Sequence, residues 1–385
     1  SVWRRTTSRS AASGSSGSRS PGGSEVRAAA MLLFAGCASR GYHLDRPIGQ
    51  ADLGVQPTAA PDAVRFVVVG DIGKWSGTPS GPDGAVVEAD LSPGFLAVAT
   101  AIRDACAEPA CDFVVVTGDN LYDNGIEIDA DADALRLMVD AYGLPTWFVL
   151  GNHDWRWLQP ELATARRELA WIARTEQARG AAHFWRMTAG PAAFWGLDSN
   201  LLVREGHLAD DRWVEAWLRT IAQDQRHPWR IAVAHHPVYS DGEHGDAGRF
   251  LDGGYKLWRG EAFRDAVEAH VLGEVDLWLN GHDHNLQLFA DGRTAFVTSG
   301  AGAKCNPAGD DDARLRPGRP APAMTRFERG FAIVEATPEV LEVTFHSLSE
   351  GAFWVARRSV DAGEWSYPSG PKVDRKTRCA KLGPG

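Results

Sequence analysis

The stretch Gly118-Asp119-Asn120-Leu121-Tyr122 follows directly after the apolar run Phe113-Val114-Val115-Val116. A short run rich in β-branched residues is typical of a buried strand, so the polar stretch marks the carboxyl end of that strand. In open α/β sheets this end is where ligands bind. A carboxylate there can bridge two metal ions, and a phenolate is a hard oxygen donor that suits ferric iron. Asp119 and Tyr122 are therefore the first candidate metal ligands.

Four other apolar runs end in a polar cluster in the same way. The runs span 64–69, 147–150, 231–234 and 275–280, and the residues that follow them are Asp71, then Asn152 with His153, then His235, then His282 with His284. One Asp or His after a strand is usually a turn residue, but five clusters in succession are not chance. Strand ends on one sheet edge deliver their side chains into one crevice, and this mixture of donors suits two ions.

Helical periodicity separates many of these runs, so the sequence predicts an α/β fold. The expected helices span 94–106, 131–142, 161–173, 210–222 and 261–272. A hairpin is expected over 184–187 and 193–197, and closing strands over 294–299, 331–335, 341–347 and 353–359.

The composition is that of a soluble globular protein. Of 385 residues, 44% are hydrophobic and 23% are charged, which permits a sizeable core, here expected as one domain over 62–360. The net charge of −10, with no dense Lys/Arg run in the body of the chain, argues against nucleic acid as a dedicated partner. A haem, nucleotide or nicotinamide cofactor has no motif, since 300–302 lacks the Rossmann context.

The first residues have the composition of a targeting segment. A Ser/Gly/Arg-rich stretch and an apolar run over 28–37, too short to span a bilayer, predict an export leader over 1–37. Ala35-Gly36-Cys37 resembles the lipobox of bacterial lipoproteins, in which Cys37 would carry a lipid anchor. An ordinary signal peptide, or a disordered leader with a chance cysteine, is the alternative. Residues 38–61 are expected as a linker.

The cysteines favour export to the periplasm or the cell surface. Without Cys37 four remain, an even number. Cys106 with Cys111 would close a tight loop, and Cys305 with Cys379 would tie the C-terminal tail over 361–385 to a glycine-rich loop. Such bonds persist outside the cytosol. Four free thiols in a cytosolic enzyme are the alternative.

The ordered clusters resemble the dispersed pattern of the calcineurin-like metallophosphoesterases, which includes GDxG, GDxxY, GNH and GHxH. The tyrosine of the second block resembles the purple acid phosphatases, and the segments 235–240, 243–245, 281–287 and 299–302 resemble their small tartrate-resistant type. The resemblance extends over about 64–359. It implies a four-layer α/β/β/α sandwich of two mixed sheets.

The resemblance also implies roles for individual residues. The ferric iron would be held by Asp71, Tyr122 and His284, and a second divalent ion (iron, zinc or manganese) by Asn152, His235 and His282. Asp119 would bridge the two ions. Asn152 would also contact the substrate, and His153 and His244 would bind its phosphate and help to protonate the leaving group. His236 and Ile72 stand where the family often has Tyr and Trp, so the residues around the ligands are expected to differ from those of the family.

These roles imply an exported acid phosphatase, active as a monomer on small phosphorylated substrates. A metal-bound hydroxide would attack the phosphate monoester directly. A phosphodiesterase or nucleotidase with the same site is the first alternative, because metal ligands do not choose between these substrates. A surface binding protein on a degenerate enzyme scaffold is the second, but it predicts broken ligand blocks and none is broken. Trp155 and Trp157 would form either an apolar wall for the leaving group or ordinary packing, which we favour.

Overall fold

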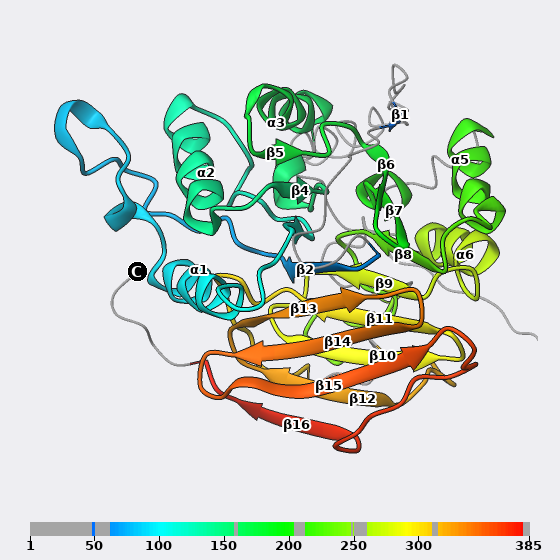
Figure 1. The fold of residues 1–385 in the computed structure, drawn as a ribbon. Coiled ribbons are helices and arrows are strands. Elements are labelled where there is room, and N and C mark those ends of the chain that lie inside the picture. The colour runs from blue at the N-terminus through cyan, green and yellow to red at the C-terminus, as the bar shows by residue number, and fades with distance from the viewer. Residues whose placement is uncertain are drawn as a thin grey trace, which may run out of the picture. The chain divides into compact units, whose positions relative to one another are not determined.

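The strands of the chain form two sheets that pack face to face (Figure 1). The computed structural model describes residues 48–50, 62–157, 161–203, 212–247, 249, 260–309 and 315–379, all of which belong to the compact unit His43–Gly385. The expectations for the leader, for Cys37 and for most of the linker lie outside these residues. Among the described residues, no helix is both long and apolar enough to cross a membrane.

The first sheet contains β2, β3 and β4, three of the strands whose ends carry candidate ligands. Its described strands run in the order β15 (Gly351–Ser359), β14 (Val340–Ser347), β13 (Gly330–Ala336), β2 (Val64–Val69), β3 (Phe113–Val116), β4 (Thr146–Phe148) and β5 (Ala178–Arg179). The pairs from β2 to β5 are parallel and the others are antiparallel, so the sheet is mixed.

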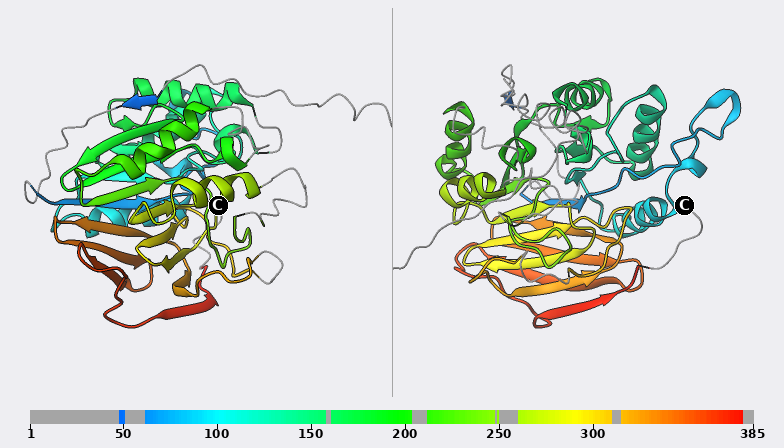
Figure 2. Two further views of the ribbon diagram at one scale, coloured as in Figure 1. Left: turned by 90° about the vertical axis from the view of Figure 1, so that its right-hand side faces the viewer. Right: turned by 180° about the vertical axis from the view of Figure 1, so that it is seen from behind.

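The second sheet contains β8 and β9, the two remaining ligand-bearing strands. Its described strands run in the order β1 (Ile48–Gln50), β6 (Phe184–Ala189), β7 (Ala192–Leu197), β8 (Trp229–Val233), β9 (Leu277–Asn280), β11 (Thr294–Ser299), β10 (Leu286–Asp291), β12 (Pro322–Phe327) and β16 (Lys372–Thr377). This sheet is also mixed. The neighbouring strands β7, β8, β9 and β11 are parallel, while β10 is antiparallel to its neighbours β11 and β12. The views in Figure 2 show β16 at the outer edge of the sheet.

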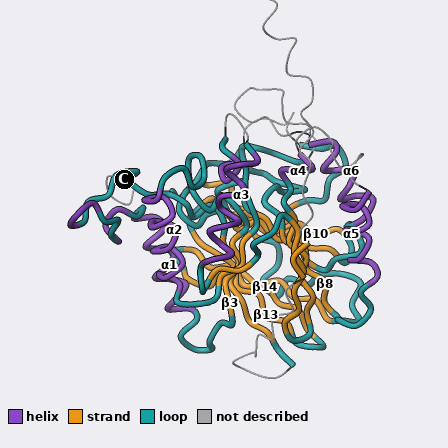
Figure 3. Tube along the Cα trace, turned by 90° about the horizontal axis from the view of Figure 1, so that it is seen from above, coloured by secondary structure: helices purple, strands orange, loops and turns teal. Residues whose placement is uncertain are grey.

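Helices flank the two sheets on both outer sides, which gives four layers (Figure 3). One side carries α1 (Pro93–Ala105), α2 (Asp129–Tyr142) and α3 (Leu162–Arg174), and the other carries α4 (Asn200–Val203), α5 (Arg212–Gln223) and α6 (Gly260–His270). Short 3-10 turns lie at Pro82–Gly84, Glu88–Asp90 and His153–Trp155. The helix α1 begins where the Ser92 hydroxyl accepts a hydrogen bond from the Gly94 N–H and Pro93 takes the first helical position.

The main core lies between the sheets, and the alternation of side chains along each strand builds it. Val64, Phe66 and Val68 of β2 belong to the inter-sheet cluster, together with Phe194 of β7 and Ile231 of β8. Of the intervening residues, Val67 and Val69 are buried as well. A strand that is apolar on both faces is what a sheet covered by helices requires, and it explains the uninterrupted valine runs.

The expected α/β sandwich of two mixed sheets is confirmed, with boundaries within a few residues of those predicted for most elements. Among the described residues, β5, β10, β12, β16 and the short helix α4 were not predicted, and β1 falls inside the expected linker. The two predicted disulfides, Cys106–Cys111 and Cys305–Cys379, are both present. The second one joins the segment that follows β16 to the loop that follows β11.

Candidate metal centre

The candidate ligands come together at one end of the sandwich. Asp71 follows β2, Asp119 follows β3 and Asn152 follows β4, while His235 follows β8 and His282 follows β9. All five residues are buried. The two sheets therefore deliver their polar strand ends to a common place, as the sequence predicts.

Three of the predicted ligands form a first cluster. The Tyr122 hydroxyl donates to Asp71 Oδ1 across 3.0 Å, and Tyr122 Oη lies 3.1 Å from His284 Nε2. His284 Nε2 is in turn 3.4 Å from Asp71 Oδ1. One phenol oxygen, one carboxylate oxygen and one imidazole nitrogen thus face a common point.

Three others form a second cluster. Asn152 Oδ1 lies 2.9 Å from His235 Nε2 and 3.1 Å from His282 Nδ1. The two imidazole nitrogens are 3.2 Å apart. His235 Nδ1 donates to the carbonyl oxygen of Thr117 across 2.9 Å, which leaves the Nε2 lone pair directed into the cluster.

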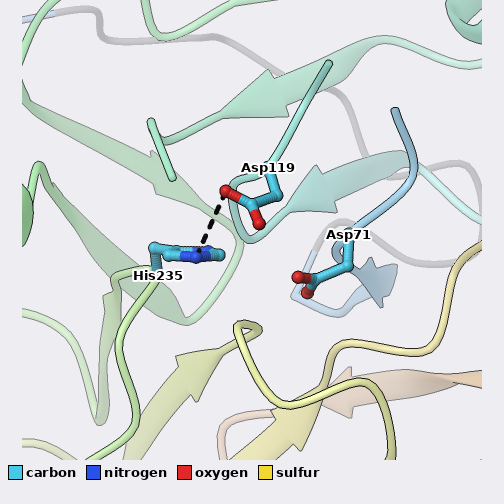
Figure 4. Close-up of side chains that lie close together, drawn as sticks. All are labelled: Asp71, Asp119 and His235. Atoms are coloured by element: carbon cyan, nitrogen blue, oxygen red, sulfur yellow. Dashed lines mark ion pairs between the residues drawn. The ribbon is translucent and has the colours of Figure 1, made fainter. Parts of the chain in front are cut away.

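Asp119 lies near one member of each cluster, Asp71 of the first and His235 of the second (Figure 4). Its Oδ1 is 3.3 Å from His235 Nε2, and ligand atoms of Asp71, Asp119 and His235 all lie within 4.8 Å of one another. The backbone N–H of His153 also donates to Asp119 Oδ1 across 3.0 Å. A carboxylate in this position has oxygens available to both clusters.

The backbone at these residues is held in an unusual conformation. Asp71, Asp119 and His282 have φ of 58°, 52° and 72°, in the left-handed region that residues other than glycine rarely adopt. Such residues cluster at functional sites, where the surrounding structure maintains them. The glycines that precede two ligands are needed for space. A Cβ on Gly151 would lie 2.2 Å from Asp119 Oδ1, and one on Gly281 would lie 2.4 Å from Asp71 Oδ2.

The charges of the cluster favour a bound cation. Burial and the nearby Asp119 carboxylate raise the pKa of Asp71 to about 8. Burial lowers the pKa of His284 to about 4, and it also lowers the pKa of His282, so both imidazoles are neutral, the form that binds metal. Oxygen donors that repel each other, beside neutral imidazoles, match the requirements of metal ions in both geometry and protonation.

A cleft of about 1040 Å³ opens beside the clusters. His153 and His244 both line it, as predicted for substrate-binding residues. The His153 and Tyr122 rings meet edge to face with their centroids 4.4 Å apart, and His153 Nδ1 donates to the carbonyl oxygen of Asp123 across 2.7 Å. The His244 ring centroid is 4.1 Å from that of His282. Both histidines are thus placed next to the candidate metal ligands.

The two tryptophans after the third cluster have different places. Trp157 lines the cleft and stacks on His153, with ring centroids 5.6 Å apart. Trp155 is fully buried, and its indole N–H donates to Asp198 across 2.9 Å. The favoured interpretation of ordinary packing is therefore confirmed for Trp155, whereas Trp157 lies where the alternative, an apolar wall, requires it.

Residues that the sequence analysis missed support the site from behind. Asp154 accepts hydrogen bonds from the backbone N–H groups of Asn120, Leu121 and Gly151. Asn120 Nδ2 donates to Glu168 of α3 across 2.8 Å. This buried network fixes the loop that carries Asp119 to the loop that carries Asn152. Its signal was present as Asn120 and Asp154 inside the quoted motifs, whereas Glu168 lies on a helix and has no local signature.

Lys304 is a second missed residue. It lines the cleft, and its Nζ lies 3.3 Å from the centroid of the Tyr122 ring. It follows β11 by five residues. Had polar residues been sought after β11 as they were after the other strands, Lys304 would have been a candidate.

The family model for the calcineurin-like phosphoesterases matches residues 64–286, which include every candidate ligand. The chain belongs to the calcineurin-like phosphoesterase family. It is therefore an enzyme of the phosphoesterase class. The match covers β2 to β9, which include all the strands whose ends carry these ligands.

Curated relatives confirm the resemblance to the purple acid phosphatases. The chain is 27% identical to purple acid phosphatase 17 of Arabidopsis thaliana, over 78% of this chain and 86% of that protein. It is also 27% identical to tartrate-resistant acid phosphatase type 5 of Sus scrofa, over 75% of this chain and 84% of that protein.

Solved structures show the fold. The purple acid phosphatase PPD1 from yellow lupin superposes with a TM-score of 0.56 at 18% identity, over 79% of this chain and 54% of that one. GAP50, described as the anchor in the inner membrane complex of Plasmodium, superposes with a TM-score of 0.52 at 17% identity, over 83% of this chain and 92% of that one. One fold thus occurs in proteins described in very different terms, so the fold alone does not decide the function of this chain.

Proposed function

We propose that the chain is an exported acid phosphatase that hydrolyses phosphate monoesters at a dinuclear metal centre. The observation that carries the proposal is the pair of three-ligand clusters with the Asp119 carboxylate between them. The names of the relatives support the reaction, and the two disulfides support export. An export leader over 1–37, with or without a lipid anchor at Cys37, completes the proposal.

The ligand chemistry assigns the ions to the two clusters. Asp71, Tyr122 and His284 would hold ferric iron, because a phenolate and a carboxylate are hard donors. Asn152, His235 and His282 would hold a divalent ion such as iron, zinc or manganese. Asp119 would serve both. Bound there, the ions would supply the Lewis acidity that activates water at acidic pH and orients the phosphoryl oxygens.

The protein's own residues bind the ester and move the proton. The hydrogen bond from His153 Nδ1 to the Asp123 carbonyl fixes the ring orientation, so His153 Nε2 is available to the phosphate. The His244 backbone N–H donates to Asp283 across 3.1 Å, which fixes the loop that carries this histidine over the cleft. In its protonated form, His244 would donate a proton to the leaving oxygen as the ester bond breaks.

The size of the cleft favours a second candidate function. A single phosphate needs far less than 1040 Å³, whereas this volume is at the upper end of sites for drug-sized molecules. A phosphodiester or a nucleotide would fill more of it. Comparing bis(nitrophenyl) phosphate with nitrophenyl phosphate measures the preference, and the monoesterase proposal predicts a higher kcat/KM for nitrophenyl phosphate.

Direct attack by water provides the test of the reaction. Hydrolysis of nitrophenyl phosphate at acidic pH, in water that contains methanol, should yield inorganic phosphate without methyl phosphate. A phosphatase that forms a phosphoenzyme transfers its phosphoryl group to methanol in a fraction of the turnovers, and it serves as the control. Formation of methyl phosphate, or absence of hydrolysis by metal-loaded protein, would contradict the proposal.

A further inference from the structure

Lys304 brings a positive charge to the wall of the cleft beside the candidate metal ligands. Its Nζ lies over the face of Tyr122, 3.3 Å from the ring centroid, and the His153 ring contacts the same tyrosine. Lys304, His153, Asn152 and His244 all line the cleft. The ammonium group is therefore close to the groups that we propose to bind the phosphate.

The loop that carries Lys304 is held on both sides of this residue. Before it, the N–H of Ala303 donates to the carbonyl oxygen of Asp71 across 3.1 Å. After it, the N–H of Asn306 donates to the carbonyl oxygen of His284, also across 3.1 Å. Cys305 is bonded to Cys379. The backbone of Lys304 is thus fixed to two segments that carry candidate iron ligands.

Within the described part of the chain, this ammonium uses none of its hydrogen-bonding capacity. It has three N–H donors, and among the described residues no carboxylate, carbonyl or hydroxyl oxygen accepts from it; its contact is the Tyr122 ring. The residue is only partly exposed. A lysine that merely balanced Asp71 and Asp119 would be expected to form a charge-assisted hydrogen bond with one of them.

We propose that Lys304 binds the phosphoryl oxygens of the substrate, as a third phosphate-binding residue beside His153 and His244. This inference rests on the proposed phosphatase function. Lysine is suited to the role because it presents a compact charge with rotatable donors, and the Tyr122 ring orients the side chain without occupying those donors. In this account, the Cys305–Cys379 bond serves binding by fixing the position of Lys304.

The test measures the affinity of metal-loaded protein for inorganic phosphate. Wild type, Lys304→Met and Lys304→Arg are titrated by calorimetry at acidic pH, and KM and kcat are measured on nitrophenyl phosphate. Lys74→Met is the matched control, because Lys74 is an exposed lysine that lines the same cleft. Metal content is determined for every variant.

Lys304→Met should weaken phosphate binding and raise KM by roughly tenfold or more, because charge-assisted hydrogen bonds are lost, while both metals stay bound. Lys304→Arg should recover most of the affinity, since guanidinium also binds phosphate. Lys74→Met should change the affinity by less than about twofold, since its charge is exposed to solvent and screened.

Unchanged phosphate affinity in Lys304→Met, equal losses in Lys304→Met and Lys74→Met, or loss of a metal in Lys304→Met would overturn the proposal. If the wild type binds and hydrolyses phosphate esters but Lys304→Met behaves like it, only the role of Lys304 is wrong. If the metal-loaded wild type neither binds phosphate nor hydrolyses the ester, the phosphatase function is wrong as well.

Discussion

The phenolic oxygen of Tyr122 lies 3.0 Å from Oδ1 of Asp71, although the two residues are 51 positions apart and follow different strands. A phenol and a carboxylate that share a proton in the metal-free protein become, on losing it, two hard anionic donors to one ion. Burial and the charges of Asp119 and Asp71 raise the pKa of Tyr122 well above its usual value. A phenolate here therefore requires a strongly charged cation as its partner.

Tyr122→Phe should abolish the visible absorption band of the iron-loaded protein and retain part of the activity. Charge transfer from phenolate to ferric iron requires the tyrosine oxygen, while Asp71, His284 and Asp119 still hold the ion. Visible spectra of wild type and variant at equal iron content provide the measurement. A band that persists in Tyr122→Phe would show that another group gives rise to it.

Asp119→Asn should lower kcat/KM by at least about 100-fold, because an amide cannot neutralise two ions as a carboxylate does. Trp157→Ala is the control from the same cleft. It should lower activity by about tenfold or less, because it removes only the stack on His153. Equal losses in the two variants would count against a bridging role for Asp119.

His244→Ala should keep both metals and the colour but slow alkyl phosphates much more than nitrophenyl phosphate. General acid catalysis contributes about 10²–10⁴-fold, and it matters most when the leaving alkoxide is poor. The ratio of kcat/KM on the two substrates measures the effect. Loss of metal, or the same slowing of both substrates, would rule out the proposed role.

Glu168→Gln should stabilise the folded protein at pH 8 but have little effect near pH 4. Burial raises the pKa of Glu168 to about 8, so this carboxyl keeps its proton in the folded protein well above the pH at which it ionises in the unfolded chain. Because the folded-state pKa exceeds the unfolded one, its stabilising contribution is complete below the unfolded value. It is lost as the pH rises through about 8.

Denaturant unfolding of wild type and Glu168→Gln across this pH range checks the prediction. Glutamine imitates the protonated acid, so the free energy of unfolding should fall less steeply with pH in the variant. Glu176→Gln, which removes an exposed carboxylate just beyond the same helix, is the control and should leave the slope unchanged. Parallel pH profiles for wild type and Glu168→Gln would show that the ionisation of Glu168 does not cause the loss of stability.

The sequence was sufficient to predict the strands that carry ligands, because strands covered on both faces are nearly all apolar and their polar ends stand out. It was insufficient for β12 and β16. In β12 the buried Arg326 pairs with Glu350, which is 24 residues away, and β16 is an edge strand whose residues are largely exposed. Burial of this kind depends on partners distant in sequence, which no local pattern reveals.

The same distinction separates the predicted residues of the candidate site from the missed ones. Ligands that lie directly after a strand were predicted, and the structure brings all seven together. Lys304 and Glu168 were missed, since Lys304 follows β11, which was expected only as a closing strand, and Glu168 lies on a helix behind the site. The favoured packing role holds for Trp155 and not for Trp157, because two tryptophans separated by one residue gave no indication of which one faces inward. Only the packing around Asp198 decides that.

Metal titration of the metal-free protein tests the dinuclear centre most directly. Bound metal, visible absorption and hydrolysis of nitrophenyl phosphate at acidic pH are followed as ferric iron and then a divalent ion are added. We expect about two ions per chain, with the visible band appearing with the ferric ion and full activity only after the second ion is bound. Full activity with a single ion, or with no bound metal, would contradict the dinuclear centre.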